Sequence, residues 1–141
     1  MDWNRCIEEA NAVKITPDRK RTEFLLKRAA ETLGALDKIT ITDKNISVFF
    51  ANYYDALLET LHALMYAKGY KVTNHYCLGY YVRDVLKEKE LFHVIDRARS
   101  VRNSIIYYGE SFDKEILLEL AGDIKDSVKR LGKIITCQKN F

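Results

Sequence analysis

The chain has 141 residues, of which 48% are apolar and 30% are charged, with one proline and six glycines. This length suits one well-packed domain spanning residues 1–141 and is short for two domains of ordinary size. Charged residues interrupt every apolar run before the ~18 residues that a membrane-spanning helix needs, and the apolar content is too high for a disordered chain. The sequence therefore predicts one folded domain that does not span a membrane.

The first residues and the cysteines indicate a cytoplasmic protein. The start MDWNRCIEEA is acidic where a secretory signal has a basic start and an apolar run. The chain has three widely spaced cysteines, Cys6, Cys77 and Cys137. An odd number at this spacing predicts three structural thiols rather than a disulfide framework or a zinc site. We expect a reducing compartment, no bound metal and no cofactor. The net charge of +3 supports nucleic-acid binding only if the basic residues gather on one face.

Apolar residues recur every three or four positions, so we predict an all-α fold. A short leader helix is expected over residues 2–13, and Thr16 is expected to cap a helix that begins at Pro17 and ends near Leu36. Residues 37–44 are predicted as a loop. The remaining helices are predicted from Thr42 or Asp43 to Gly69, from Thr73 or Asn74 to Leu86, from Leu91 to Tyr108, and, after a cap at Ser111 or Asp113, from Lys114 to Thr136.

Short connections make successive helices antiparallel. We therefore predict an up-and-down antiparallel bundle of four or five helices, with its core in residues 17–136.

The segment DRARSVRNSIIYYGE, residues 96–110, carries the side chains best suited to bind a ligand. At about 100° per residue, Ala98 lies at the centre of an apolar face. That face comprises Leu91, Val94, Ala98, Val101 and Ile105, and the opposite polar stripe comprises Asp96, Arg99, Asn103 and Tyr107. Arg102 lies only about 40° from the centre of the apolar face, which predicts a partly buried guanidinium.

Two interpretations of Arg102 follow from its predicted burial. Arg102 could tie two helices together through a carboxylate, supplied by Asp55, Glu59 or Asp84. Alternatively, its planar fork could bind a phosphate, with Asn103 as a neutral donor and Arg99 as a second cation one turn earlier.

Two stretches of this sequence resemble the HEPN domain family. The run FFANYYDALLETLHALMYAKGYKVTNHYCLGYYV is similar to the family's long tyrosine-rich helix, its Lys-Gly-Tyr turn and the next, histidine-bearing helix. The run RARSVRNSIIYYG is similar to the signature in which an arginine, often followed by asparagine, precedes a histidine by four to six residues. The resemblance covers residues 23–129. It implies a HEPN-like bundle that forms a homodimer, with two signature helices meeting in a cleft.

The resemblance also implies a role with RNA or nucleotides. Many HEPN proteins are metal-independent ribonucleases, often toxins paired with a minimal nucleotidyltransferase, whereas others bind nucleotides or proteins without catalysis. By motif, Arg102 takes the place of the signature arginine and Asn103 that of its polar neighbour. Tyr107 stands where the histidine is expected. The implied catalytic residues are Arg102, Asn103 and Tyr107, and the implied nucleotide- or RNA-binding residues are Arg99, Arg102, Asn103 and Tyr108.

The tyrosine limits the chemistry that the motif can perform. An ordinary tyrosine has a pKa near 10 and is a poor base at neutral pH, whereas imidazole titrates near 6.5. We expect Tyr107 to donate a proton or a hydrogen bond in a degenerate ribonuclease. The alternative is a non-catalytic nucleotide-binding or protein-interaction module in which the Arg102 region forms the dimer interface.

Other candidate residues have structural interpretations. His62, His75 and His93 are predicted to be exposed or structurally hydrogen-bonded, and His93 points about 180° away from Arg102. The tyrosines in the middle of the chain suit core packing and a dimer interface, or the stacking of bases if they lie beside a basic groove. A second basic cluster is predicted to form a solvated helix face and comprises Arg19, Lys20, Arg21, Lys27 and Arg28.

Overall fold

The computed structural model describes residues 1–137, so the last four residues of the predicted domain lie outside the described part. The described residues form six helices and one small sheet. The long helices are α2 (Arg19–Leu36), α3 (Ile46–Lys68), α5 (Lys89–Tyr108) and α6 (Lys114–Thr136). The short elements are α1 (Trp3–Glu8), β1 (Ala12–Lys14), β2 (Tyr70–Val72) and α4 (His75–Asp84).

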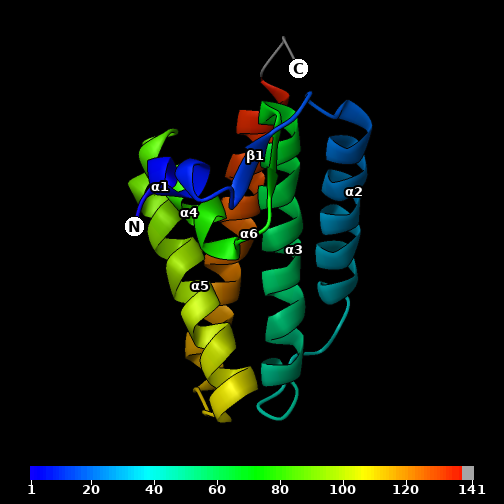
Figure 1. Cartoon of the computed structure of the whole chain (residues 1–141). Helices are drawn as coiled ribbons and strands as arrows, with labels where there is room; N and C mark the ends of the chain where they lie inside the picture. Colours follow the sequence, from blue (N-terminus) through cyan, green and yellow to red (C-terminus); the bar gives the residue numbers. More distant parts are fainter. Residues whose placement is uncertain (138–141) are drawn as a thin grey trace.

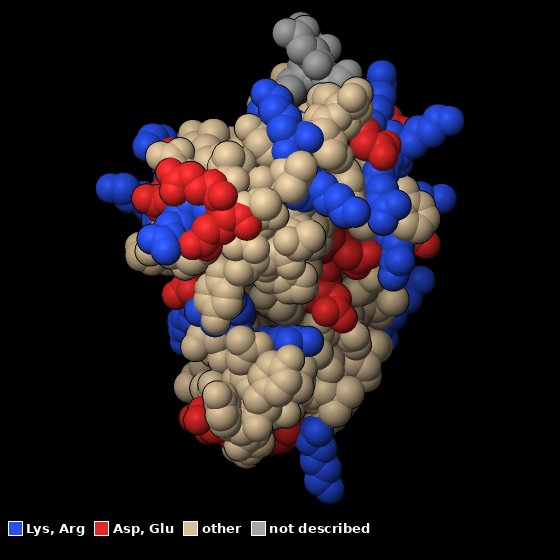
Figure 2. Space-filling view, in the orientation of Figure 1, with Lys and Arg blue, Asp and Glu red and all other residues tan. Residues whose placement is uncertain are grey.

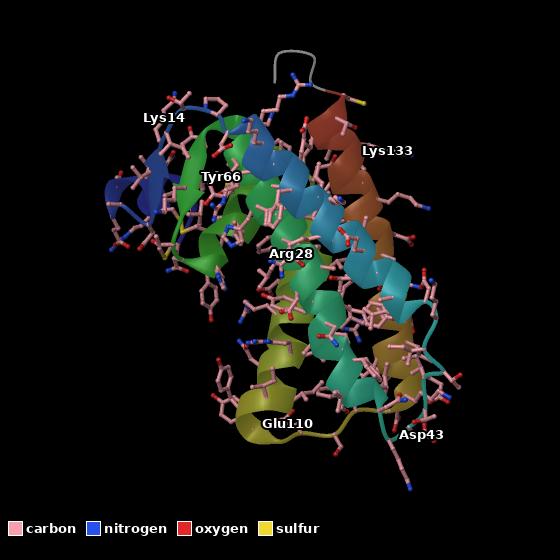
Figure 3. All side chains as sticks on the ribbon, turned by 90° about the vertical axis from the view of Figure 1, so that its right-hand side faces the viewer. Lys14, Arg28, Asp43, Tyr66, Glu110 and Lys133 are labelled. Atoms are coloured by element: carbon pink, nitrogen blue, oxygen red, sulfur yellow. A yellow bond between two sulfur atoms is a disulfide. The ribbon has the colours of Figure 1, made fainter. Side chains whose placement is uncertain are left out.

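The four long helices run alternately in opposite directions (Figure 1), which confirms the predicted all-α up-and-down bundle. α1, α4 and the sheet lie beside the upper half of the bundle in this view. Figure 2 shows the same face in space-filling form, with Lys and Arg side chains gathered along its right-hand edge, where α2 lies. In the turned view, the loop at Asp43 and the loop at Glu110 lie at the same end of the bundle (Figure 3), as alternating helices require.

α3 is the central helix of the bundle. It contacts α2, α5 and α6, and buried residues occupy positions all along its length. A helix that is apolar on most of its circumference is stable only when neighbours cover it. The predicted core face of α5 is confirmed, because Leu91, Ala98 and Val101 are buried. Within the described residues, no helix is both long and apolar enough to span a bilayer.

Helix starts differ from the prediction where a side-chain cap lies later in the sequence. Asp18 caps α2, accepting a 3.0 Å hydrogen bond from the backbone N–H of Arg21, so Thr16 is not the cap and Pro17 lies before the helix. α3 begins at Ile46, later than predicted, because Thr42 and Asn45 exchange backbone-to-side-chain hydrogen bonds in the preceding turn. Of the two predicted starts of the next helix, Thr73 and Asn74, the structure has Asn74 as the cap, and α4 ends at Asp84 rather than at Leu86.

The predicted leader helix over residues 2–13 is present but shorter than predicted. The helix ends at Glu8, Ala10 has a φ of +58°, and β1 then pairs antiparallel with β2, with Ala12 opposite Val72. The partner strand is distant in sequence, so no local pattern predicts this pairing. The core also begins earlier than residue 17, because Trp3 is buried in the main apolar cluster.

The prediction of three free thiols is wrong. Cys6 and Cys77 form a disulfide between α1 and α4, and only Cys137 among the described cysteines is free. The fold brings together two residues 71 positions apart, which spacing alone could not predict. Their number and spacing therefore no longer support a reducing compartment.

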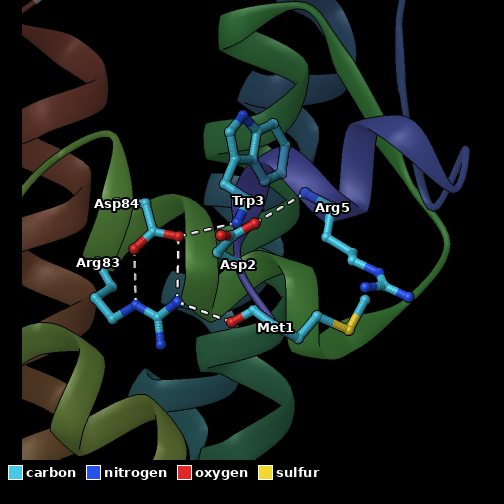
Figure 4. Close-up of polar contacts among 6 residues, drawn as sticks. All are labelled: Met1, Asp2, Trp3, Arg5, Arg83 and Asp84. Atoms are coloured by element: carbon cyan, nitrogen blue, oxygen red, sulfur yellow. Dashed lines mark hydrogen bonds and ion pairs between the residues drawn. The ribbon is translucent and has the colours of Figure 1, made fainter.

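Polar contacts reinforce the disulfide (Figure 4). The backbone N–H of Trp3 donates to Asp84 Oδ2 at 2.9 Å, and Arg83 bridges this carboxylate to the Met1 carbonyl, which accepts at 3.1 Å. The Trp3 ring packs edge-on against Tyr70 and Tyr81. The N-terminal segment is thus fixed to both ends of α4.

We predict that Cys77→Ser lowers the free energy of unfolding by about 2–4 kcal/mol, because the disulfide restricts the unfolded chain. Urea denaturation with and without a dithiol reductant measures this difference. Cys137→Ser is the matched control and should unfold like the native protein under both conditions. Equal stability of the native protein with and without the reductant, after thiol counting has verified reduction, contradicts the prediction.

Candidate functional site

Arg102 is half-buried on α5 and has an incomplete set of polar partners. Its Nε is buried without a hydrogen bond, and the one hydrogen bond of its guanidinium within the described residues is a long one, 3.5 Å from Nη1 to Asn103 Oδ1. The guanidinium carbon lies 5.7 Å from the ring centroid of Tyr54 and 6.0 Å from that of Tyr107. The predicted partial burial is confirmed, and two aromatic rings lie near the cation.

The carboxylates proposed from the sequence do not form ion pairs with Arg102. Asp84 pairs with Arg83 at 2.7 Å, and Glu59 Oε2 lies 3.0 Å from Nε of Arg28. Burial raises the pKa of Asp55 and the charge of Arg102 partly offsets that shift, so Asp55 senses Arg102 without pairing with it. In residues 1–137, no carboxylate lies within 4.0 Å of the Arg102 guanidinium nitrogens.

Arg102 opens onto a pocket of about 200 Å³ between α3, α4 and α5, which we call the arginine pocket. Its lining residues are Tyr54, Leu58, His75, Tyr76, Arg99, Arg102, Asn103 and Tyr107. The structure therefore brings together four of the five site residues expected from the sequence. The fifth, Tyr108, is 77% exposed and does not line the pocket.

Arg99 is held in this pocket by contacts on two sides. Its Nη2 lies 2.8 Å from Asp96 Oδ1, and its Nη1 donates to the Tyr76 hydroxyl at 3.3 Å. Its guanidinium carbon also lies 4.5 Å from the centroid of the Tyr76 ring. Tyr76 was missed as a site residue, although a helix start at Thr73 or Asn74 was predicted.

A second pocket of about 420 Å³ adjoins the first, between α2 and α3, and we call it the α2–α3 pocket. Leu58 lines both pockets. The lining residues are Arg21, Leu25, Arg28, Asp55, Leu58, Glu59, His62 and Tyr66. Figure 3 labels Arg28 on α2 and Tyr66 on α3, which lie on this side of the bundle. Two members of the predicted basic cluster thus line a pocket instead of a purely solvated face.

Two histidines meet where the pockets adjoin. His62 lines the α2–α3 pocket, His75 lines the arginine pocket, and their ring centroids are 5.7 Å apart. Burial lowers the pKa of His62, and the nearby charges of His75 and Arg21 lower it further. The sequence predicts each histidine to be exposed or structurally hydrogen-bonded, and it does not predict this contact because the two residues lie on different helices. His93 is exposed and lines neither pocket.

The arginine pocket combines the donors that an anion requires with aromatic surface. Arg99 and Arg102 supply two guanidinium groups, and Asn103 supplies an amide donor. Tyr76 and Tyr107 are 48% and 68% exposed, so their rings are accessible at its edge. A guanidinium group can donate two parallel hydrogen bonds to the oxygens of one phosphate, and flat aromatic rings stack on bases. The pocket is therefore chemically suited to an anionic ligand that carries a flat ring.

Comparisons with protein-family models, with curated proteins and with solved structures gave no match.

We predict that His62 titrates below its ordinary pKa of 6.5, because burial disfavours the imidazolium. His75→Ala should move the His62 pKa upward, since the charge of His75 contributes to the shift. The unfolded chain binds this proton more readily than the folded protein, so the free energy of unfolding decreases as the pH falls from about 6.5 to the lower pKa of His62 in the folded protein. NMR titration, with His62→Gln used to assign the signal, measures both values. A His62 pKa at or above 6.5 in the native protein contradicts the prediction.

Proposed function

We propose that this chain is a HEPN-like module that binds the phosphate of a nucleotide, free or within RNA, in the arginine pocket. The observation that carries the proposal is the state of Arg102. Its guanidinium is half-buried, has no carboxylate partner within residues 1–137, and holds a buried Nε without a hydrogen bond. A desolvated cation without a counterion is costly, and a bound anion would offset that cost.

The neighbours of Arg102 favour phosphate over a simple carboxylate. Arg99 lines the same pocket, so an anion bound there meets two positive charges, and phosphate carries more charge and more acceptor oxygens than a carboxylate. Asn103 adds an uncharged donor beside Arg102. The accessible rings of Tyr76 and Tyr107 at the edge of the pocket offer a surface for the sugar attached to that phosphate.

The proposal includes a homodimer formed through the C-terminal end of α5. Ile106, Tyr107 and Tyr108 are 47%, 68% and 77% exposed in the single chain, and contiguous apolar exposure of this kind is typical of an interface. Such a dimer would bring two arginine pockets near each other. The family resemblance adds a minimal nucleotidyltransferase as a candidate partner, with this chain as the toxin-like component.

A second candidate function is metal-independent RNA cleavage, and the position of His75 favours it. The signature histidine is replaced by Tyr107, but His75 lines the pocket that holds Arg102. In this mechanism, imidazole accepts the proton of the 2′-hydroxyl as its oxygen attacks phosphorus, and Tyr107 donates a proton to the departing 5′-oxygen. Arg102 would stabilise the charge that develops on the phosphoryl oxygens.

We predict that Arg102→Ala weakens nucleoside monophosphate binding by at least about tenfold, because a charged hydrogen-bonding partner of the phosphate is removed. Isothermal titration calorimetry measures the affinity. Arg97→Ala is the matched control, since Arg97 is exposed on the same helix and lines neither pocket. The Arg102→Ala variant should still fold, because Arg102 forms no ion pair with a carboxylate of residues 1–137.

Equal affinities of the native protein and Arg102→Ala contradict the binding proposal. Sedimentation of the same samples gives their oligomeric state. A dimer lost in Arg102→Ala, with no nucleotide binding by the native protein, would instead support the alternative in which the Arg102 region forms a dimer interface and binds no nucleotide.

For the second candidate, we predict that the native protein cleaves single-stranded RNA in excess EDTA and that His75→Ala and Arg102→Ala each abolish cleavage. Tyr107→Phe should slow it, because the phenol proton is lost. Gel analysis of a labelled oligonucleotide measures the rate, and His93→Ala controls for loss of an exposed histidine. Cleavage that persists in Arg102→Ala would come from a contaminant, and its absence in the native protein would leave binding as the function.

A further inference from the structure

The α2–α3 pocket adjoins the arginine pocket and differs from it in chemistry. Leu58 lines both, and the His62–His75 contact lies where they adjoin. At about 420 Å³, the α2–α3 pocket is within the range of ordinary small-molecule sites, whereas the arginine pocket, at about 200 Å³, is below it. The α2–α3 pocket therefore offers room for the part of a ligand that the smaller arginine pocket does not hold.

We propose that the α2–α3 pocket receives the base of the nucleotide whose phosphate lies at Arg99 and Arg102, and that Glu59 selects guanine. This inference rests on the proposed function, since it takes the arginine pocket as the phosphate site.

The sides of the α2–α3 pocket suit a flat, partly apolar ring. Leu25 from α2 and Leu58 from α3 supply aliphatic surface. Tyr66 supplies an aromatic ring, and the guanidinium carbon of Arg21 lies 5.3 Å from the centroid of that ring. Aliphatic, aromatic and guanidinium surfaces all pack against base faces, and they do so with any base. Selection among bases must therefore come from the polar groups.

Glu59 is the polar group best placed to read a base. Its side chain is only 17% exposed, and its buried Oε2 has no hydrogen bond even though Nε of Arg28 lies 3.0 Å away. The contact is thus an ion pair in which the N–H does not point along a hydrogen bond to the oxygen. Arg28 is 61% exposed, so its guanidinium can move into solvent when the donors of a base take its place at the carboxylate.

An ionised carboxylate only accepts hydrogen bonds, which determines the base that it can bind. Guanine presents two adjacent donors, N1–H and the 2-amino group, and these match the two oxygens of one carboxylate. Adenine has an unprotonated N1 on the corresponding edge, which would face the carboxylate as an acceptor. Hypoxanthine keeps the N1–H but lacks the 2-amino group. Asp55, on the same side of α3, adds a further acceptor to the pocket.

The test is calorimetric binding of four probes to the native protein: GMP, IMP, AMP and ribose 5-phosphate. We expect GMP to bind on the order of tenfold more tightly than AMP, because guanine donates two hydrogen bonds to the Glu59 carboxylate. The affinity for IMP should lie between the two, since hypoxanthine donates one. Glu59→Gln should reduce the preference for GMP over AMP to less than about twofold. It should leave the affinity for ribose 5-phosphate unchanged, because that probe has no base. Glu31→Gln is the matched control, since Glu31 is exposed on α2 and lines neither pocket.

A second measurement locates the base. In methyl NMR spectra, GMP should shift the Leu25 signals and ribose 5-phosphate should not, because Leu25 lines only the α2–α3 pocket. Equal affinities for GMP, IMP and AMP, with ribose 5-phosphate bound and Arg102→Ala defective, would overturn the guanine inference and leave the phosphate site standing. A preference for GMP that persists in Glu59→Gln would overturn the role of Glu59. Failure of all four probes to bind would overturn the phosphate site and the base site together.

Discussion

The need to cover α3 determines the arrangement of the other elements. Its buried residues extend over its whole length, and α2, α5 and α6 pack against it. One stripe of α3 remains only partly covered, and it contains Asp55, Glu59, His62 and Tyr66 at helical spacing. Polar and titratable side chains can occupy that stripe without disrupting the core, and the α2–α3 pocket forms along it.

The N-terminal segment contributes to the site indirectly, through α4. The disulfide at Cys77 holds the first turn of α4, and the contact of Trp3 with Asp84 holds its last residue. His75 and Tyr76 belong to that first turn and line the arginine pocket. Arg99 in turn stacks on Tyr76. A segment that has no residue in the pocket therefore helps to determine the pocket's shape.

The helices were predictable because their determinants are local. Periodic apolar residues and caps such as Asn74 lie within a few positions of the structure that they specify, and the partial burial of Arg102 followed from its angle on the helix. The strand pairing of Ala12 with Val72, the disulfide and the His62–His75 contact each join segments distant in sequence. Such contacts depend on how the helices pack, which no local pattern specifies. The same reason explains why Tyr76 and the α2–α3 pocket were missed.

The disulfide has a consequence for the covalent topology of the molecule. It closes a ring of chain from Cys6 to Cys77 that contains α2 and α3, while α5 and α6 lie outside the ring. The loop between α2 and α3, with Thr40, Asp43 and Lys44 exposed, lies within that ring. A protease that cut this loop would open the ring without separating the two pieces. Under denaturing conditions, the nicked protein would keep its mass, apart from one added water, until a reductant separated a fragment of about forty residues containing α1, β1 and α2.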